Sequence, residues 1–227
     1  MLKKFNDLPL DMQNDAVRAY YDILSKKKVS LFFKRVFDVF VSLILLLVIW
    51  PILLILAIII KIDSPGPVFF RQERVTKYGR RFRIFKFRTM VNNADKMGSL
   101  VTTKNDSRVT KVGSVIRKTR IDELPQLFNI FLGDMTLVGT RPEVVKYVDR
   151  YTDEMKATLL LPAGVTSEAS ICYKDEEKLL ENAENADDTY VNEILPEKMK
   201  YNLKAIEKFN FFSDIKTMFR TVIAVLK

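Results

Sequence analysis

The sequence predicts a mostly helical α+β protein that is monotopic in a membrane, with a re-entrant helix broken at a proline, a small β-hairpin and interfacial amphipathic helices. Three features indicate this class: an uncharged apolar run with a central proline, an alternating apolar and charged pattern after it, and amphipathic patterns near both chain ends. The 227 residues suit one domain with appendages. We expect an N-terminal amphipathic extension at 1–30, a re-entrant membrane helix at 31–62, and a cytoplasmic domain at 63–227 that ends in an interfacial helix.

The apolar run extends from Val39 to Ile60 without a charged residue. About 22 residues of helix are long enough to cross ~30 Å of hydrocarbon. A cleaved signal peptide does not fit, because the run starts too far along the chain, is too long and is not followed by a small-residue cleavage site. Pro51 lies at the midpoint and removes a backbone hydrogen bond, so the helix should kink or break there.

Positive charge flanks the apolar run on both sides. The flanking cations are Lys26, Lys27, Lys28, Lys34 and Arg35 before the run, and Lys61, Arg71, Arg74, Arg80 and Arg81 after it. The positive-inside rule then places both ends on the cytoplasmic side. A helix that breaks at Pro51, and enters and leaves by one face, satisfies both observations. A kinked helix that spans the membrane and a buried helix of a soluble protein are the alternatives.

Amphipathic patterns are found before the apolar run and at the end of the chain. The first has apolar residues at Met12, Val17, Tyr20, Tyr21 and Leu24, and we expect a peripheral appendage that packs on the domain or the membrane. The second has an apolar stripe bordered by lysine and arginine, made of Phe211, Ile215, Met218, Phe219, Val222 and Ile223. This stripe fits a helix in the headgroup plane and a core helix equally well.

The segment between these ends contains a predicted hairpin followed by short helices and loops. PVFFRQERV and FRIFKFRTM alternate apolar and charged residues like two half-buried strands, and KYGRR is the turn between them. The stretch GDMTLVGTRPE is rich in turn residues and should be extended or looped. We expect helices at 113–120, at 124–132, from 142 to about 160, and over the last thirty residues.

The net charge of +9 is unevenly distributed along the chain. From Lys61 to Ile121 there are 16 basic and 4 acidic residues, whereas from Asp122 to Lys227 there are 13 basic and 19 acidic residues. The basic segment should therefore face phosphates of a lipid headgroup, a phosphorylated substrate or a nucleic acid. Because the chain contains no recognisable nucleic-acid-binding module, we expect no nucleic-acid partner.

The chain contains no histidine and one cysteine, Cys172. This excludes a Ser-His-Asp triad, a Cys-His dyad, a histidine-based metal site and an internal disulfide. Any chemistry must therefore come from carboxylates, lysine, arginine and hydroxyl groups, with a hard metal bound through oxygen.

Asp122 and Glu123 follow directly on the basic residues Arg117, Lys118 and Arg120. The neighbouring cations should favour the ionised form, which can act as a nucleophile. Two adjacent carboxylates can also share a divalent metal that neutralises a phosphate. Taken alone, an Asp-Glu pair is more often the solvated start of a helix.

Three further cations are candidates for phosphate binding. Lys86 and Arg88 are two residues apart, so they share one face of a strand and could clamp a phosphate. Arg141 lies between a glycine turn and Pro142, where its guanidinium could make a bidentate phosphate contact. Each of the three could equally be an ordinary surface residue, so none identifies a phosphate site by itself.

Read in order, the motifs are more specific than their parts. They are KRVFDVFVSLILLLVIWPILLILAIIIKIDSPGPVFFRQERV, FRIFKFRTM, SRVTKVGSVIRKTRIDELPQLFNIFLGDMTLVGTRPE and the terminal DIKTMFRTVIAVL. Together they resemble the bacterial sugar transferase family, the monotopic polyprenyl-phosphate phosphoglycosyl transferases. The resemblance runs from about Phe33 to Glu143, resumes at Pro162 and near Asp214, and leaves the first 30 residues outside.

The resemblance implies a membrane enzyme with a covalent intermediate. Asp122 would attack the β-phosphate of a nucleotide sugar, expected to be a UDP sugar, and release the nucleoside monophosphate. Polyprenyl (undecaprenyl) phosphate would then take the phosphosugar, the first step of surface glycan or exopolysaccharide synthesis. Glu123, with Asp122, would bind Mg²⁺ or orient the pair. Pro51 would break the re-entrant helix.

The resemblance also implies that residues 63–227 form the catalytic domain on the cytoplasmic face of the bacterial inner membrane. Arg117 and Arg141 would lie around the phosphate groups, with Lys86 and Arg88 on the basic strand. The family's GPRP turn reads Gly139-Thr140-Arg141-Pro142 here, and 161–177 departs from the family pattern. The sugar, the nucleotide, the downstream polymer, and whether the protein forms a homodimer therefore stay open. The alternative function is a non-catalytic membrane adaptor whose basic segment binds anionic lipid.

Overall fold

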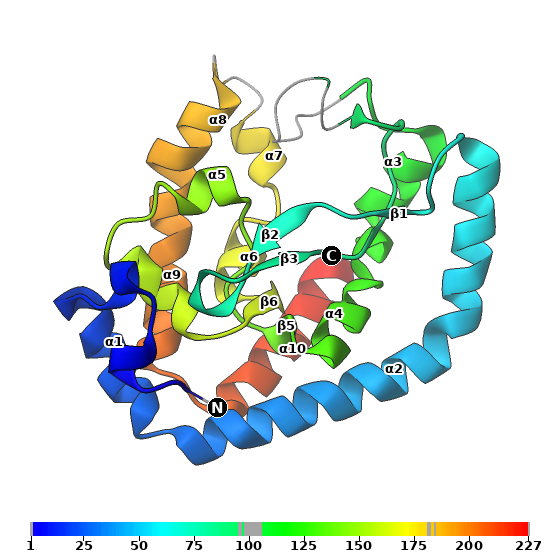
Figure 1. The fold of residues 1–227 in the computed structure, drawn as a ribbon. Coiled ribbons are helices and arrows are strands. Elements are labelled where there is room, and N and C mark those ends of the chain that lie inside the picture. Colours follow the sequence, from blue (N-terminus) through cyan, green and yellow to red (C-terminus); the bar gives the residue numbers. More distant parts are fainter. Residues whose placement is uncertain (1, 95–96, 98–105, 181–182, 184, 227) are drawn as a thin grey trace.

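The computed structural model describes residues 2–94, 97, 106–180, 183 and 185–226. Figure 1 shows a mostly helical body with one long helix, α2 (Lys28–Asp63), running around it. Among the described residues the strands form three two-stranded sheets. The predicted class of a mostly helical protein with a small hairpin is confirmed.

α2 is one continuous helix of 36 residues that contains Pro51. Figure 1 shows that it bends past its midpoint, as expected where proline removes a backbone hydrogen bond. The helix is long and apolar enough to cross a membrane, and only 6% of its most apolar 18-residue window is buried. Within the described chain, α2 is therefore not a buried core helix.

The first half of α2 docks on the body through a polar stripe. Lys34, Asp38 and Ser42 are four residues apart, so they share one helix face, and all three are buried. Lys34 Nζ donates to the carbonyl oxygen of Val138 at 2.8 Å and to Asp214 Oδ2 at 2.6 Å. Because each buried charge has a partner, these contacts favour one position of this half of the helix on the body.

Further contacts hold the same part of α2 on the body. The Asp38 carboxylate accepts hydrogen bonds from the Thr136 hydroxyl and from the Leu137 backbone N–H. Arg35 donates to the carbonyl oxygens of Ile130 and Phe131, two of the four C-terminal carbonyls that a helix leaves unsatisfied. These carbonyls belong to α4 (Gln126–Leu132).

The predicted hairpin is confirmed, in two short ladders. β2 (Glu73–Val75) pairs antiparallel with β3 (Arg81–Arg83), and β1 (Phe69–Phe70) pairs antiparallel with β4 (Lys86–Phe87). The turn between β2 and β3 is a 3₁₀ segment, η3 (Lys77–Gly79). Because β4 follows directly on this hairpin, its residues are carried back towards the end of α2.

A parallel pair of strands was not predicted. β5 (Met135–Val138) lies in the stretch expected to be extended, and it pairs with β6 (Ala163–Thr166). Parallel pairing needs a long crossover, and here the crossover is made of residues 139–162. Gly164 is essential to the close approach, since a Cβ at this position would lie 2.2 Å from the backbone nitrogen of Gly139.

The predicted helix from 142 to about 160 is wrong. Only α5 (Val145–Val148) and the 3₁₀ segment η6 (Met155–Leu160) are helical. Between them, the Thr152 hydroxyl accepts the backbone N–H of Met155 at the start of η6. A side chain that bonds a nearby backbone N–H competes with the hydrogen bonds of a continuous helix.

The remaining elements are mostly short helices. The predicted helix at 113–120 is α3, and the helix at 124–132 is preceded by a 3₁₀ turn, η5. Their bounds are α3 (Lys111–Lys118), η5 (Ile121–Glu123), α6 (Glu168–Cys172), α7 (Glu176–Leu179), α8 (Ala186–Thr189), the π-helical η7 (Tyr190–Ile194), α9 (Leu195–Glu207) and α10 (Phe211–Leu226).

The apolar stripe of α10 divides between two environments. Phe211, Ile215 and Met218 are half-buried, and the Phe211 ring lies edge-on to Phe37 of α2 at 5.4 Å. Phe219, Val222 and Ile223, with Phe212, are exposed. The helix therefore packs on the body with one side and presents an apolar surface with the other.

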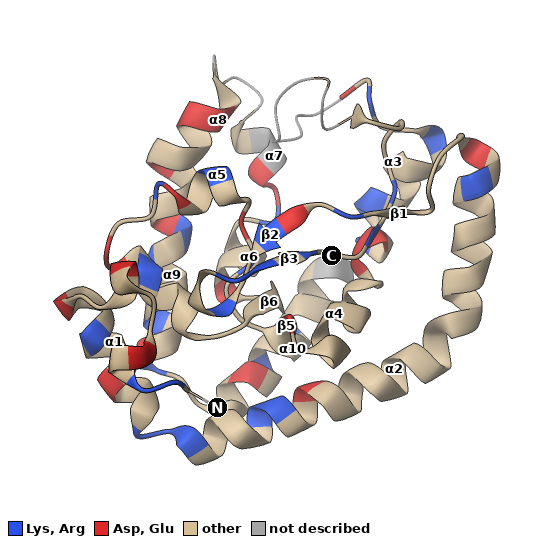
Figure 2. Ribbon diagram, viewed as in Figure 1, with Lys and Arg blue, Asp and Glu red and all other residues tan. Residues whose placement is uncertain are grey.

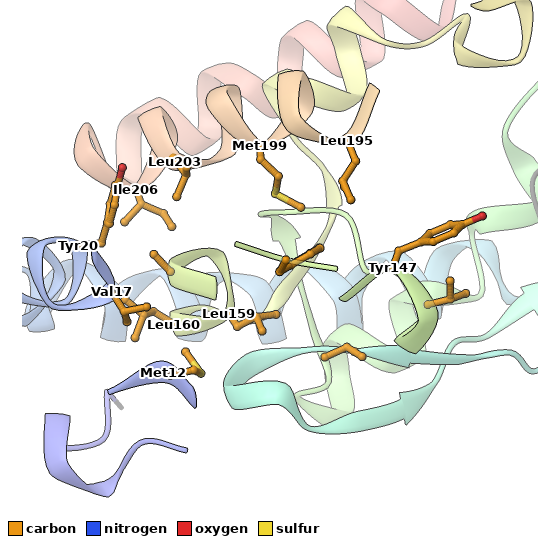
Figure 3. Packing of buried hydrophobic residues seen from close by; sticks show 14 of the residues in the cluster. Met12, Val17, Tyr20, Tyr147, Leu159, Leu160, Leu195, Met199, Leu203 and Ile206 are labelled. Atoms are coloured by element: carbon orange, nitrogen blue, oxygen red, sulfur yellow. The ribbon is translucent and has the colours of Figure 1, made fainter. Parts of the chain in front are cut away.

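The segment before α2 is part of the largest hydrophobic core, not a peripheral appendage. It contains η1 (Phe5–Asp7), η2 (Leu10–Met12) and α1 (Asp15–Ser25). Val17 and Leu24 are fully buried in one cluster with Leu160 and Leu195. Figure 3 shows Met12, Val17 and Tyr20 facing side chains of η6 and α9. Segments on both sides of α2 in the sequence therefore share one core.

We predict that Leu24→Ala lowers the free energy of unfolding by about 2–5 kcal/mol, because it opens a cavity in this shared core. Chemical denaturation in detergent micelles measures the change. Leu10→Ala is the matched control, because Leu10 is 88% exposed in the same segment and should change stability little. Equal effects of the two substitutions would contradict the shared core.

Candidate active site

Three separate segments bring the predicted acid pair and cations together. Asp122 and Glu123 lie in η5 and are 6% and 9% exposed. The chain turns into η5 through Arg120, whose φ of +57° is left-handed and therefore strained for a residue with a Cβ. Lys86 comes from β4, and Arg141 comes from the loop after β5. The short turn of η5 thus points both carboxylates at the hairpin and at this loop.

Glu123 is surrounded by donors. Arg141 makes a bidentate contact, with Nη1 at 3.0 Å from Oε2 and Nη2 at 2.6 Å from Oε1. Lys86 Nζ lies 3.1 Å from Oε1, and Gln126 Nε2 donates to Oε2 at 3.2 Å. Burial alone would raise the pKa of Glu123, but Arg141, Lys86 and Arg120 lower it well below its usual value. Glu123 is therefore held as a carboxylate.

Asp122 has a different environment. Its Oδ2 lies 3.6 Å from Lys86 Nζ, and its buried Oδ1 has no hydrogen-bond partner among the described residues. Burial raises the pKa of Asp122; repulsion from Glu123 adds to the rise, and Lys86, Arg117 and Arg141 only partly oppose it. Neighbouring cations therefore act on Asp122 in the expected direction, but burial outweighs them, so the net shift of its pKa is upward and not downward as the sequence suggested.

Gln126 is a residue of the site that was not predicted. It is 1% exposed and donates to Glu123, while its Oε1 has no hydrogen-bond partner in the described part of the chain. The sequence signal that could have identified Gln126 is its position three residues after Glu123, because residues three or four apart lie on the same face of a helix. Asp122 Oδ1 and Gln126 Oε1 are both hard oxygen acceptors without a donor.

Arg88 lies away from the acid pair. It is 5% exposed, and Nη2 donates to the carbonyl oxygen and hydroxyl of Ser64 at 2.6 and 2.9 Å. Ser64 is the C-cap of α2, so Arg88 fastens the end of the long helix. Arg117, in the last turn of α3, is near enough to lower the pKa of Asp122. The structure thus brings Lys86, Arg117 and Arg141 to the pair, but not Arg88.

The basic and acidic parts of the sequence also lie in different regions of the structure. Figure 2 shows basic residues along β2 and β3, and acidic residues on α7 and α8. Arg120 connects the two regions, because Nη1 lies 3.8 Å from Glu123 Oε1 and Nη2 donates to the carbonyl oxygen of Lys174. The acid pair therefore lies where the basic hairpin meets the acidic half of the chain.

Comparison with known proteins identifies the family. The sequence model of the bacterial sugar transferases matches residues 29–227. The chain belongs to the bacterial sugar transferase family. The match begins one residue into α2, so the segment of η1, η2 and α1 lies outside it, as the resemblance implied. This segment nevertheless shares its hydrophobic core with the matched part of the chain.

Several relatives of this family member are named for their reactions. It is 37% identical over 198 residues to a UDP-N-acetylgalactosamine-undecaprenyl-phosphate N-acetylgalactosaminephosphotransferase of Aeromonas hydrophila, covering 86% of this chain and 44% of that protein. It is 37% identical over 200 residues to a UDP-glucose:undecaprenyl-phosphate glucose-1-phosphate transferase of Klebsiella pneumoniae, covering 86% and 40%. The uncharacterized sugar transferase EpsL of Bacillus subtilis is 34% identical over 193 residues, covering 85% and 87%. The chain thus spans about two fifths of the first two relatives and most of the third.

The two carboxylates should contribute to stability with opposite signs. Because the folded-state pKa of Asp122 is raised, stability falls as the pH rises above its unfolded value of about 3.9. Asp122→Asn removes this loss, so we predict a higher melting temperature at pH 7 and no gain below about pH 4. Differential scanning fluorimetry in detergent measures both.

Glu123→Gln is the matched comparison. The folded-state pKa of Glu123 is lowered, so its stabilisation is present above about pH 4.3 and is lost as the pH falls through the lowered value. Breaking this buried pair should cost about 3–5 kcal/mol. Destabilisation by Asp122→Asn at pH 7 would contradict the assigned environments.

Proposed function

We propose that this chain transfers a sugar-1-phosphate from a nucleotide sugar, with UDP as the nucleotide, to undecaprenyl phosphate. The reaction would pass through an aspartyl phosphosugar and begin the synthesis of a surface glycan or exopolysaccharide. The observation that carries the proposal is the unequal carboxylate pair, in which Glu123 is neutralised by cations and Asp122 keeps an oxygen without a donor. The relatives named as UDP-sugar:undecaprenyl-phosphate transferases support the substrates.

In the first step, a carboxylate oxygen of Asp122 attacks the β-phosphorus of the donor. A bond from Asp122 to phosphorus forms, the bridging P–O bond breaks, and the nucleoside monophosphate leaves. In the second step, an oxygen of undecaprenyl phosphate attacks the same phosphorus, and the Asp122 carboxylate is released. Two displacements of this kind predict ping-pong kinetics.

The chain's cations supply the charge neutralisation that phosphoryl transfer depends on. Lys86 lies between the carboxylates, and Arg141 is fixed by Glu123 with its side chain 31% exposed. Arg117 lies on the side of Asp122. Because Glu123 orients both Lys86 and Arg141, it acts as a positioning residue while Asp122 is the nucleophile.

We expect Mg²⁺ as the cofactor of this reaction. Among the described residues no group of three Asp, Glu, His or Cys side chains could hold a metal, but Asp122 Oδ1 and Gln126 Oε1 are acceptors without donors and are of the type that Mg²⁺ binds. Both oxygens of Glu123 already have donors. We therefore expect Asp122 and Gln126 to hold the ion, with Glu123 adjacent. When bound, Mg²⁺ neutralises phosphate charge.

We place the protein on the cytoplasmic face of the bacterial inner membrane, with α2 as a re-entrant helix that enters and leaves by one face. The shared core supports this placement: a spanning α2 would put α1 and α9 on opposite sides of the membrane, and they pack together. The bend at Pro51 and the exposed apolar side chains of α2 agree with it. The exposed face of α10 would lie at the interface beside lipid.

A radiolabel assay with a panel of UDP sugars, undecaprenyl phosphate and Mg²⁺ tests the reaction. We predict labelled lipid with wild type, and at least a 1,000-fold loss with Asp122→Asn, about the loss expected for removal of a nucleophile. Full turnover by Asp122→Asn would refute the nucleophile. Absence of turnover with every donor would favour the membrane adaptor, in which the basic segment binds anionic lipid without catalysis.

Thiol labelling tests the membrane placement. Cys172 is exposed after α2, and Cys172→Ser with Leu10→Cys moves the only thiol to an exposed site before α2. In right-side-out spheroplasts, we predict that both thiols are protected from a membrane-impermeant maleimide and react after permeabilisation. Labelling of one thiol from outside would mean that α2 spans the membrane.

A further inference from the structure

One edge of the hairpin turns backbone groups away from its strand partner. The Ile84 N–H, directly after β3, donates to the carbonyl oxygen of Gln72 at 3.0 Å. In an antiparallel ladder, the residues on either side of such a pair direct their N–H and C=O groups the other way. Arg83 and Phe85 therefore present a carbonyl oxygen and an N–H on the opposite side, where both groups need partners.

The Asn129 side chain of α4 supplies both partners. Its Oδ1 accepts the Phe85 N–H at 2.7 Å, and its Nδ2 donates to the carbonyl oxygen of Arg83 at 3.1 Å. Nδ2 also donates to Asp134 Oδ2 at 3.2 Å, and the residue is fully buried. One side-chain amide thus takes the place of a neighbouring strand and fastens this edge of the hairpin to α4.

The fastened stretch of backbone leads directly to the lysine of the site. Phe85 is the residue before Lys86, and Lys86 Nζ lies 3.1 Å from Glu123 Oε1 and 3.6 Å from Asp122 Oδ2. Asn129 lies in α4, which follows the turn η5 that carries both carboxylates. The two backbone contacts of Asn129 therefore join the strand that carries Lys86 to the segment that carries the acid pair.

We propose that Asn129 is a positioning residue that holds Lys86 within reach of the acid pair. Its relevance to catalysis rests on the proposed function, in which the Lys86 charge compensates that of the transferred phosphate. A displacement of about 1 Å in a site that depends on positioning can cost about 100-fold in rate. The contact between Lys86 and the carboxylates can also be measured without turnover.

Two substitutions remove the amide, and a third is the matched control. Asn129→Leu removes both backbone contacts at similar volume, and Asn129→Ser leaves a hydroxyl that is too short to hold both groups. Asn202→Leu is the control, because Asn202 is also buried but lies in α9, where its amide contacts Met199 Sδ at 3.7 Å. If Asn129 only stabilises the fold, the variants at both positions lower the melting temperature and leave the folded site unchanged.

Zero-length coupling with a water-soluble carbodiimide measures the Lys86 contact, because an amide forms only where an amine can reach an activated carboxylate. The folded protein is treated in detergent with EDTA, and mass spectrometry of the digest quantifies the crosslink from Lys86 to Asp122 or Glu123. The internal reference in the same sample is the crosslink between Lys146 and Asp187, whose Nζ and Oδ2 lie 2.5 Å apart.

We expect both Asn129 variants to lower the Lys86 crosslink at least about threefold relative to the internal reference, because the unpaired backbone groups turn to water and move the strand. Asn202→Leu should leave this ratio unchanged. An equal fall in Asn202→Leu would mean a general loosening of the fold and would overturn the positioning role.

Turnover gives a second readout, in a double-mutant cycle with Lys86→Met. If Asn129 acts through Lys86, Asn129→Leu lowers kcat/KM by about 10- to 100-fold when Lys86 is present. In the Lys86→Met background the same substitution should change kcat/KM by less than about twofold. Losses of equal size in the two backgrounds would show that Asn129 does not act through Lys86.

The outcomes separate this proposal from the proposed function. An unchanged crosslink ratio in the folded Asn129 variants, or no Lys86 crosslink in wild type, would overturn the positioning role, whatever the activity. If Asn129→Leu does not fold, Asn129→Ser decides alone. A selective loss of the Lys86 crosslink in a protein that transfers no sugar phosphate would support the positioning role and refute the proposed function.

Discussion

The structure depends on one constraint: segments from both sides of a long apolar helix share a single hydrophobic core. Val17 and Leu24, before α2, are buried with Leu160 and Leu195, after it. Both ends of α2 are therefore fixed on one body, although 36 residues of helix extend about 54 Å. The helix must run around that body, as in Figure 1, and most of its apolar side chains are not buried. The buried Lys34–Asp214 pair and the Arg88 cap fasten its two halves.

The site follows from how this body distributes charge. Two adjacent carboxylates in one buried turn cannot both be neutralised by the same cations, and here the bidentate arginine and the lysine favour Glu123. Glu123 is held by its cations, whereas Asp122 has an oxygen without a hydrogen-bond partner among the described residues and a raised pKa. In the proposed function, this difference in environment makes Glu123 the orienting and Asp122 the reactive carboxylate, a division that recurs among enzymes with paired acids.

Sequence reasoning was most successful for elements whose contacts join residues close together in the chain. The hairpin was predictable because alternation and turn residues act over a few positions, and the pairing of β2 with β3 confirms it. It failed where distant segments decide. The β5–β6 pairing depends on a glycine contact across the crossover. Gln126 was not singled out, because an amide shows its role only through its partners.

By itself, the sequence determined the long apolar helix with its proline, the basic hairpin, and the order of motifs that marks the family. These properties are local, because they depend on composition, periodicity and spacing along the chain. Only the tertiary structure decided that Val17 and Leu24 belong to the core, that Arg88 caps α2, and that the pKa of Asp122 rises. Each of these depends on burial and on partners far apart in the chain, and burial reverses the effect that neighbouring charges have in a solvated segment.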